Sequence, residues 1–121
     1  MQLFTKAQRD RLIANFRANQ QNPVETDHWP VVRLFTPDAQ ATWLLSEYDP
    51  LEELLFGLCD LGVGCPELGY VSRAELEELR GALGLRVERD LHWQARGSLA
   101  AYAKAAGHAG GIVELPAGVG Q

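Results

Sequence analysis

The order of hydrophobic and polar residues predicts a helix at the start of the chain and a β-hairpin after it. Thr5 and Gln8 have the spacing of a capping box, and the apolar residues behind them recur at helical intervals, so we expect a helix over about residues 5–19. Two runs rich in branched and aromatic residues, at about 31–36 and 41–48, are separated by the turn-forming letters TPD. This pattern is typical of two antiparallel strands joined by a short turn.

The segment over residues 50–61 fits two structures. Its leucines match a helical stripe, and Pro50 and Glu52 stand where a helix start would place them. A buried strand over about 54–61 fits the same letters, and Gly57 would weaken a helix there by about 1 kcal/mol relative to alanine. We therefore predict the strand, and the helix stays open as the alternative.

The next stretch of the chain predicts two strands with a helix between them. Residues 67–71 favour a strand that returns along the previous one, and Ser72 with Glu75 favours a short helix to about Arg80. The letters LRVERDLHW, at 85–93, alternate between apolar and polar residues. A period of two residues predicts a strand with one apolar face.

The end of the chain predicts a last helix and a short edge segment. Ser98 favours a helix that ends at Gly107, and residues 111–115 favour a short edge strand. Together these elements predict an α+β fold, a largely antiparallel sheet of about five strands with three helices covering one face or its ends. The length fits a single domain over residues 1–108, with residues 109–121 forming the edge segment and a flexible tail.

Composition favours a globular cytoplasmic protein. Hydrophobic residues make up 46% of the chain and charged residues 22%. No apolar run approaches the roughly 20 residues that cross a bilayer, and the first residues lack the cationic and apolar regions of a signal peptide. We therefore expect a cytoplasmic protein without a membrane partner, whose two cysteines stay reduced.

Charge is distributed unevenly along the chain. Residues 1–21 hold four basic residues and one acidic residue, a net charge of +3. Residues 22–121 hold seven basic and fifteen acidic residues, a net charge of −8, and the two parts together give the −5 of the whole chain. Because binding to a phosphate backbone needs cationic groups, this acidic body makes direct binding of nucleic acid an unfavourable interpretation.

The letters CDLGVGCPELG raise the question of a metal or phosphate site. Cys59 and Cys65 have five residues between them, whereas paired zinc ligands are usually about two to four residues apart. No lysine–serine pair and no helix follow the glycines, as a phosphate loop requires, and no nearby base would activate a thiol. We therefore expect no metal and no cofactor, and we expect Gly62 and Gly64 to supply positive φ angles in a hairpin loop.

Acidic residues and histidines from several segments form one candidate constellation. If these segments meet, their carboxylates and imidazoles would line a polar cleft suited to acid–base chemistry or to recognition. The alternative is a solvated rim in which Arg89 pairs with one or two of the acidic residues. The candidate residues are Asp27, His28, Asp60, Glu67, Glu88, Arg89, Asp90 and His92.

Four stretches of the chain resemble a family of bacterial proteins. They are DHWPVVRLFTPDAQATWLLSEYDP, FGLCDLGVGCPELGYVS, AELEELRG and VERDLHW, and the likeness covers about residues 3–106. In order and spacing they are similar to the domain-of-unknown-function family 2958. The resemblance implies a small protein of the kind carried on plasmids, conjugative elements and other mobile DNA, and it implies no particular activity.

The expected function is that of an accessory protein of mobile DNA that binds another protein, encoded by the host or by the element. Residues 25–90 hold fourteen acidic and five basic residues, a net charge of −9, so one version is an acidic anti-defence factor directed against restriction or CRISPR systems. One alternative is a small hydrolase or transferase that uses the acidic and histidine cleft. The other is a module that binds a small molecule or a nucleotide.

Overall fold

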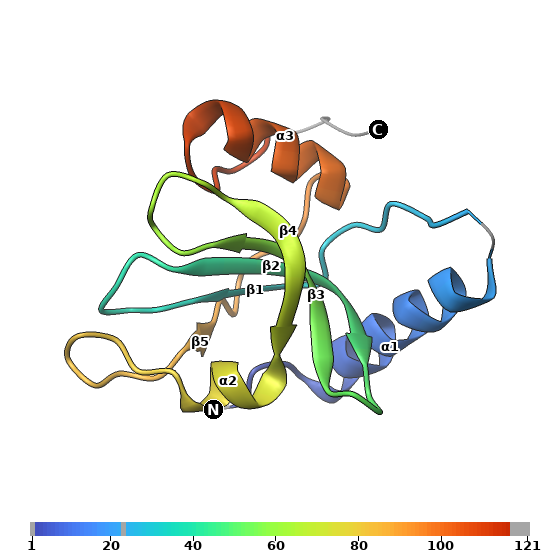
Figure 1. The fold of residues 1–121 in the computed structure, drawn as a ribbon, viewed down its shortest axis with the longest axis horizontal. Coiled ribbons are helices and arrows are strands. Elements are labelled where there is room, and N and C mark those ends of the chain that lie inside the picture. Colours follow the sequence, from blue (N-terminus) through green and yellow to red (C-terminus); the bar gives the residue numbers. More distant parts are fainter. Residues whose placement is uncertain (1, 23, 117–121) are drawn as a thin grey trace.

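The computed structural model describes residues 2–22 and 24–116, which form one antiparallel sheet of five strands with three helices (Figure 1). The strand order is β4-β3-β2-β1-β5, so four strands follow one another as a meander and the fifth joins beside the first. The predicted α+β class is confirmed. The elements are α1 (Lys6–Gln21), β1 (Val32–Phe35), β2 (Thr42–Asp49), β3 (Leu54–Asp60), β4 (Glu67–Ser72), α2 (Arg73–Glu78), β5 (Glu88–Arg89) and α3 (Leu99–Ala109).

The helices begin at the predicted capping residues. The hydroxyl of Thr5 accepts the backbone N–H of Gln8 at 3.1 Å, and the Gln8 side chain accepts the backbone N–H of Thr5 at 2.8 Å. Ser72 and Ser98 each accept a backbone N–H from the first turn of their helices. These bonds satisfy donors that a helix start would otherwise leave unpaired, so short sequence motifs place all three helix starts.

The segment that fitted two structures is a strand. It forms β3, and its register places Gly57 opposite Leu45 of β2. A Cβ atom on Gly57 would overlap the carbonyl oxygen of Leu44, so the two strands approach closely at this point. A register shift between Leu45 and Glu47 forms a bulge in β2 directly beside this approach.

The strand predicted over residues 85–93 is wrong in its extent, because β5 has two residues and the pairing with β1 ends with the backbone N–H of Asp90, which donates to the carbonyl of Arg33 at 2.9 Å. Its partner β1 is bounded by Pro30 and Pro37, and prolines cannot continue a ladder of backbone hydrogen bonds. Beyond β5 the Asp90 carboxylate accepts the backbone N–H of His92 at 3.1 Å, which turns the chain away.

The last helix does not end at Gly107 as predicted. Gly107 stays helical, and the helix ends at Gly110, whose φ of 79° is the left-handed conformation that closes many helices. The correction has a simple reason, since a glycine inside a helix can keep helical angles and only the position that needs a positive φ ends it.

The edge strand predicted over residues 111–115 is also wrong, because this segment is irregular. The backbone N–H of Ile112 donates to the Asp60 carboxylate at 2.9 Å instead of to a strand, and Leu115 is buried beneath α3. The remainder of the predicted tail, residues 117–121, lies outside the described residues.

The sheet is covered on both faces, and the expectation of helices on one face or at its ends is wrong. Trp43 and Leu45 of β2 belong to the core cluster that contains the buried residues of α1 and α2, whereas Leu44 belongs to the cluster under α3. Since neighbouring strand residues point to opposite faces, α3 lies on the other side of the sheet from α1 and α2 (Figure 1). No helix in the described part of the chain is both long enough and apolar enough to cross a membrane.

Candidate functional site

A groove of about 1020 Å³ lies between α1, the segment before β1 and the segment after β5. We call it the α1 groove. It brings the letters DHWP and LHW together, so three of the eight candidate residues share one site. The lining residues are Ala7, Gln8, Arg11, Asn15, Thr26, Asp27, His28, Trp29, Pro30, Val31, Leu91, His92, Trp93, Gln94 and Ala95.

One wall of the groove is tied to the start of α3. The Asp27 carboxylate accepts the backbone N–H of Ala100 at 3.1 Å, and the backbone carbonyl of His28 accepts that of Leu99 at 2.9 Å. With the Ser98 hydroxyl accepting the next N–H, the first three donors of α3 are satisfied. A carboxylate at a helix N-terminus also has a favourable interaction with the helix dipole, so Asp27 has a structural role in α3.

Two buried nitrogen atoms in residues that line the groove have no hydrogen-bond partner within the described residues, Nε2 of His28 and Nε1 of Trp93. The Trp93 ring is fixed by Tyr102 of α3, with 5.8 Å between the ring centroids. A buried polar group without a partner costs about 1–3 kcal/mol. The fold therefore carries this cost in the wall of the groove.

The rim of the groove exposes large apolar side chains. Trp29 is 44% exposed and Leu91 is 61% exposed, and Arg11 stands beside them on α1. Tryptophan and arginine are enriched where proteins bind one another. The sequence reasoning missed Trp29 and Leu91, although Trp29 stands outside the alternating pattern, directly before Pro30, and that position was an available signal.

The groove does not contain an assembled acid–base pair. Among the described residues, no hydrogen bond joins the imidazole of His28 or His92 to a carboxylate, and only the backbone of His92 contacts Asp90. The described residues also contain no group of three or more His, Cys, Asp or Glu that could hold a metal ion. Both cysteines are free, and burial raises the pKa of Cys59, which lowers the fraction of reactive thiolate.

The glycine loop has the simple geometry that its sequence indicates. Gly62 and Gly64 have φ angles of 80° and 86° in the turn between β3 and β4, so the predicted positive φ angles are confirmed. Asp60 is buried at the start of this turn, and its two carboxylate oxygens accept the backbone N–H groups of Gly62 and Ile112, each at 2.9 Å. Asp60 therefore holds the turn and the segment after α3 together.

The remaining candidates lie on the two opposite edges of the sheet. Glu67 begins β4, whereas Glu88 and Arg89 form β5, and three strands lie between those edges. At about 4.8 Å per strand, the two edges are about 19 Å apart along the sheet. The condition that these segments meet is therefore not met by Glu67 and the residues of β5, and Asp90 pairs with Arg33 at 3.2 Å.

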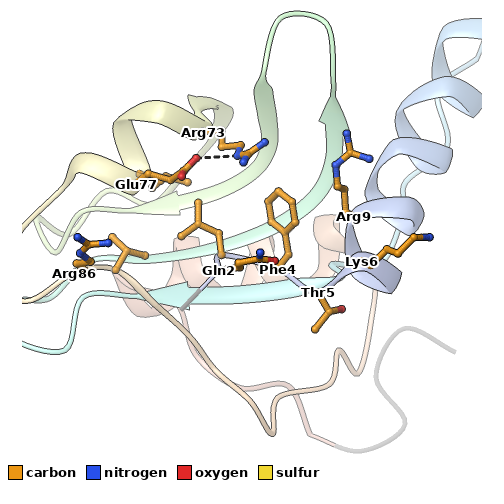
Figure 2. A pocket seen from close by; sticks show the side chains of 11 residues that line it. Gln2, Phe4, Thr5, Lys6, Arg9, Arg73, Glu77 and Arg86 are labelled. Carbon is orange, nitrogen blue, oxygen red and sulfur yellow. Dashed lines mark hydrogen bonds and ion pairs between the residues drawn. The ribbon is translucent and has the colours of Figure 1, made fainter.

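A second hollow, of about 440 Å³, lies where the N-terminal segment meets α2 and the residues before β5 (Figure 2). We call it the basic pocket. None of the eight candidate residues lines it. The net positive charge of the first segment was the signal that could have indicated it. Its charged lining residues are Lys6, Arg9, Arg73, Glu77 and Arg86, and its other lining residues are Gln2, Leu3, Phe4, Thr5, Leu76 and Val87.

Comparison with known proteins gives one match. The model of a family described as "Protein of unknown function (DUF2958)" matches residues 3–113, which include every residue that lines the α1 groove. The chain matches no curated protein and no solved structure among those with which it was compared.

Proposed function

The chain belongs to the DUF2958 family, and we propose that it acts by binding another protein through the α1 groove. The observation that carries this proposal is the exposure of two large apolar side chains, Trp29 and Leu91, in the lining of one groove. Burial of the two apolar side chains would supply the main favourable free energy. The exposed polar groups beside these side chains, such as the Arg11 guanidinium, would supply specificity.

The charge of the chain supports a basic partner. Residues 25–90 carry a net charge of −9, and the field of the whole protein accelerates association with a partner of opposite charge. The groove itself is lined by one basic and one acidic side chain, Arg11 and Asp27, so the charge acts on the approach of the partner rather than within the groove. Nucleases of restriction and CRISPR systems carry basic surfaces because they bind nucleic acid. An anti-defence role for a protein of mobile DNA, acting in the cytoplasm on a host or element-encoded partner, is the version that this charge balance favours.

A hydrolase or transferase has less support. The two acids best placed for chemistry accept backbone N–H groups, Asp27 from Ala100 and Asp60 from Gly62 and Ile112. A carboxylate that is needed to hold a helix start or a turn is a poor choice for a proton-transfer group, because each change of its charge would weaken the fold. The observations on the groove therefore support recognition more than catalysis.

The proposal is tested by capturing partners from host lysate and measuring the affinity of each purified partner by calorimetry. We expect the double variant Trp29→Ala/Leu91→Ala to bind its partner about tenfold or more weakly, as for the loss of two interface anchors. Leu51→Ala is the matched control, because Leu51 is 91% exposed in the turn between β2 and β3 and does not line the groove. Partners that bind the double variant as tightly as the wild type would contradict the proposal.

A further inference from the structure

The basic pocket concentrates positive charge in an acidic protein. Four basic side chains and one acidic side chain line it, a net charge of +3, whereas the whole chain has −5. Like charges held together repel one another and destabilise the fold unless a counter-charge is bound. This imbalance points to an anionic ligand.

A buried tyrosine holds two of the arginines in place. Tyr48 is 1% exposed, and its hydroxyl accepts a hydrogen bond from Nη1 of Arg73 at 3.4 Å, while the guanidinium of Arg9 lies 6.0 Å from its ring centroid. The Phe4 ring packs against the same tyrosine with 5.6 Å between centroids, and in Figure 2 it stands between Arg9 and Arg73. The Arg73 guanidinium is thus positioned before any ligand binds, which lowers the entropy cost of binding, and the exposed Arg9 lies beside the same ring.

Part of this positive charge has no counter-charge in the protein. Lys6 pairs with Asp10 at 2.9 Å, and Arg73 pairs with Glu77 at 2.8 Å and with Glu53 at 3.6 Å. Arg9 and Arg86 make no ion pair within the part of the chain that the structure describes, so these two guanidinium groups carry the uncompensated charge. Helix α1, which is 16 residues long, also begins at the pocket, and Thr5 and Lys6 of its first turn line it. The partial positive charge of that helix end adds to the two arginines.

The floor of the pocket is apolar. Leu3, Phe4, Leu76 and Val87 line it and belong to the buried core cluster on the α1 side of the sheet. A free inorganic anion gains nothing from such a floor, whereas a ligand with an apolar or aromatic part can bury that part against it. The volume of about 440 Å³ lies within the range of about 300–1,000 Å³ that is usual for sites of small organic ligands.

We propose that the basic pocket binds an organic phosphate of nucleotide size. The phosphate contacts the guanidinium groups of Arg9 and Arg73, since guanidinium groups form paired hydrogen bonds with phosphate oxygens. Arg86 lies at the other end of the pocket in Figure 2 and contacts a polar group on the remainder of the ligand. The flat ring of the ligand lies over the apolar floor beside Phe4. This site lies outside the α1 groove and adds a small-molecule ligand to the protein partner proposed above.

Calorimetric titration of the full chain with AMP, GMP, CMP and UMP tests the proposal, with inorganic phosphate and the four nucleosides as reference ligands. We expect at least one nucleotide to bind tenfold or more tightly than both inorganic phosphate and its own nucleoside. Arg9→Gln/Arg86→Gln should weaken that binding tenfold or more. Arg17→Gln removes one charge from the same helix outside the pocket and should change the affinity less than twofold.

Each other outcome overturns the proposal. The proposal fails if none of the four nucleotides binds, or if none binds more tightly than inorganic phosphate. It also fails if the double arginine variant binds nucleotide as tightly as the wild type. Arg9 and Arg86 are exposed, so the double variant is expected to fold. Arg86→Gln alone should also weaken nucleotide binding, by a smaller factor than the double variant. The groove variant Trp29→Ala/Leu91→Ala should bind nucleotide like the wild type, which separates this site from the protein-binding groove.

Discussion

At the scale of single residues, Glu47 shows how position in the fold changes the chemistry of one side chain. It lies in β2 beside the bulge, half-buried, and accepts a hydrogen bond from the Asn19 side chain at 3.1 Å. Burial raises the pKa of the Glu47 carboxyl above its ordinary value of 4.5, the hydrogen bond from Asn19 lowers it in part, and the charge of Glu25 raises it further. The net direction is upward, so the folded protein holds this proton more tightly than the unfolded chain does.

This raised pKa predicts a dependence of stability on pH. Stability falls as pH rises through the interval that begins near the unfolded value of 4.5, because there the folded state binds more protons than the unfolded state. In Glu47→Gln the titrating proton is gone and an acceptor for Asn19 remains. We expect its free energy of unfolding, measured in urea at several pH values, to fall less across that interval. Glu52→Gln, an exposed control, should keep the wild-type slope, and a wild-type slope in Glu47→Gln would contradict the prediction.

Single residues were also where sequence reasoning had least power over the site. Asp27 and Asp60 were recognised as notable acids, but their donors, Ala100 and Ile112, lie 73 and 52 positions further along the chain. A contact between residues so far apart in the chain leaves no pattern in the local sequence. The sequence therefore could not distinguish an acid that stabilises the fold from one that takes part in catalysis. The basic pocket was missed for the same reason, because its four basic side chains come from three separate segments.

At the scale of elements, the close approach of β2 and β3 makes one glycine indispensable. A methyl group on Gly57 would overlap the backbone of Leu44, whereas one on Gly69, its cross-strand neighbour in β4, would meet no atom within 4 Å. We therefore expect Gly57→Ala to lose about 2 kcal/mol or more of unfolding free energy. Gly69→Ala is the matched control and should change stability by less than about 1 kcal/mol, in either direction. If chemical denaturation gave the same loss of unfolding free energy for both variants, β2 and β3 would be able to move apart and make room for the methyl group.

Elements whose signals are local were predicted well. The capping residue Thr5, the turn between β1 and β2 and the positive φ of Gly62 all depend on a few neighbouring residues. The extent of β5 and the face on which α3 lies were not predicted, since both depend on partners far along the chain. The apolar run WLL in β2 was the available sign that both faces of the sheet are covered. A strand with one solvent-exposed face alternates between apolar and polar residues instead.

At the scale of the whole molecule, α3 forms a layer with its own core that is fastened at both ends. Asp27 holds its first turn, and Asp60 holds the segment that follows it. We expect Asp27→Ala/Asp60→Ala to speed hydrogen exchange of the α3 amides about tenfold or more, because each lost acceptor costs about 1 kcal/mol of local stability. Amides of α1, on the opposite face, should keep their protection.

The control for this prediction is Asp10→Ala, which removes an exposed carboxylate that pairs with Lys6 on the surface of α1. It should leave exchange in α3 unchanged. If the double variant instead accelerated exchange equally in α1 and α3, the molecule would open as one unit and the layer under α3 would have no separate stability.

The position of the tryptophans makes the two proposed sites optically distinct. Trp43 is 3% exposed in the core, whereas Trp29 and Trp93 line the α1 groove. Indole fluorescence moves to shorter wavelength when water is excluded, so a partner that covers Trp29 shifts its emission while Trp43 contributes a constant background. The basic pocket has no tryptophan among its lining residues, and a nucleotide bound there leaves the emission wavelength of Trp29 unchanged. Occupancy of the groove can therefore be followed in the unlabelled protein, even with the second ligand present.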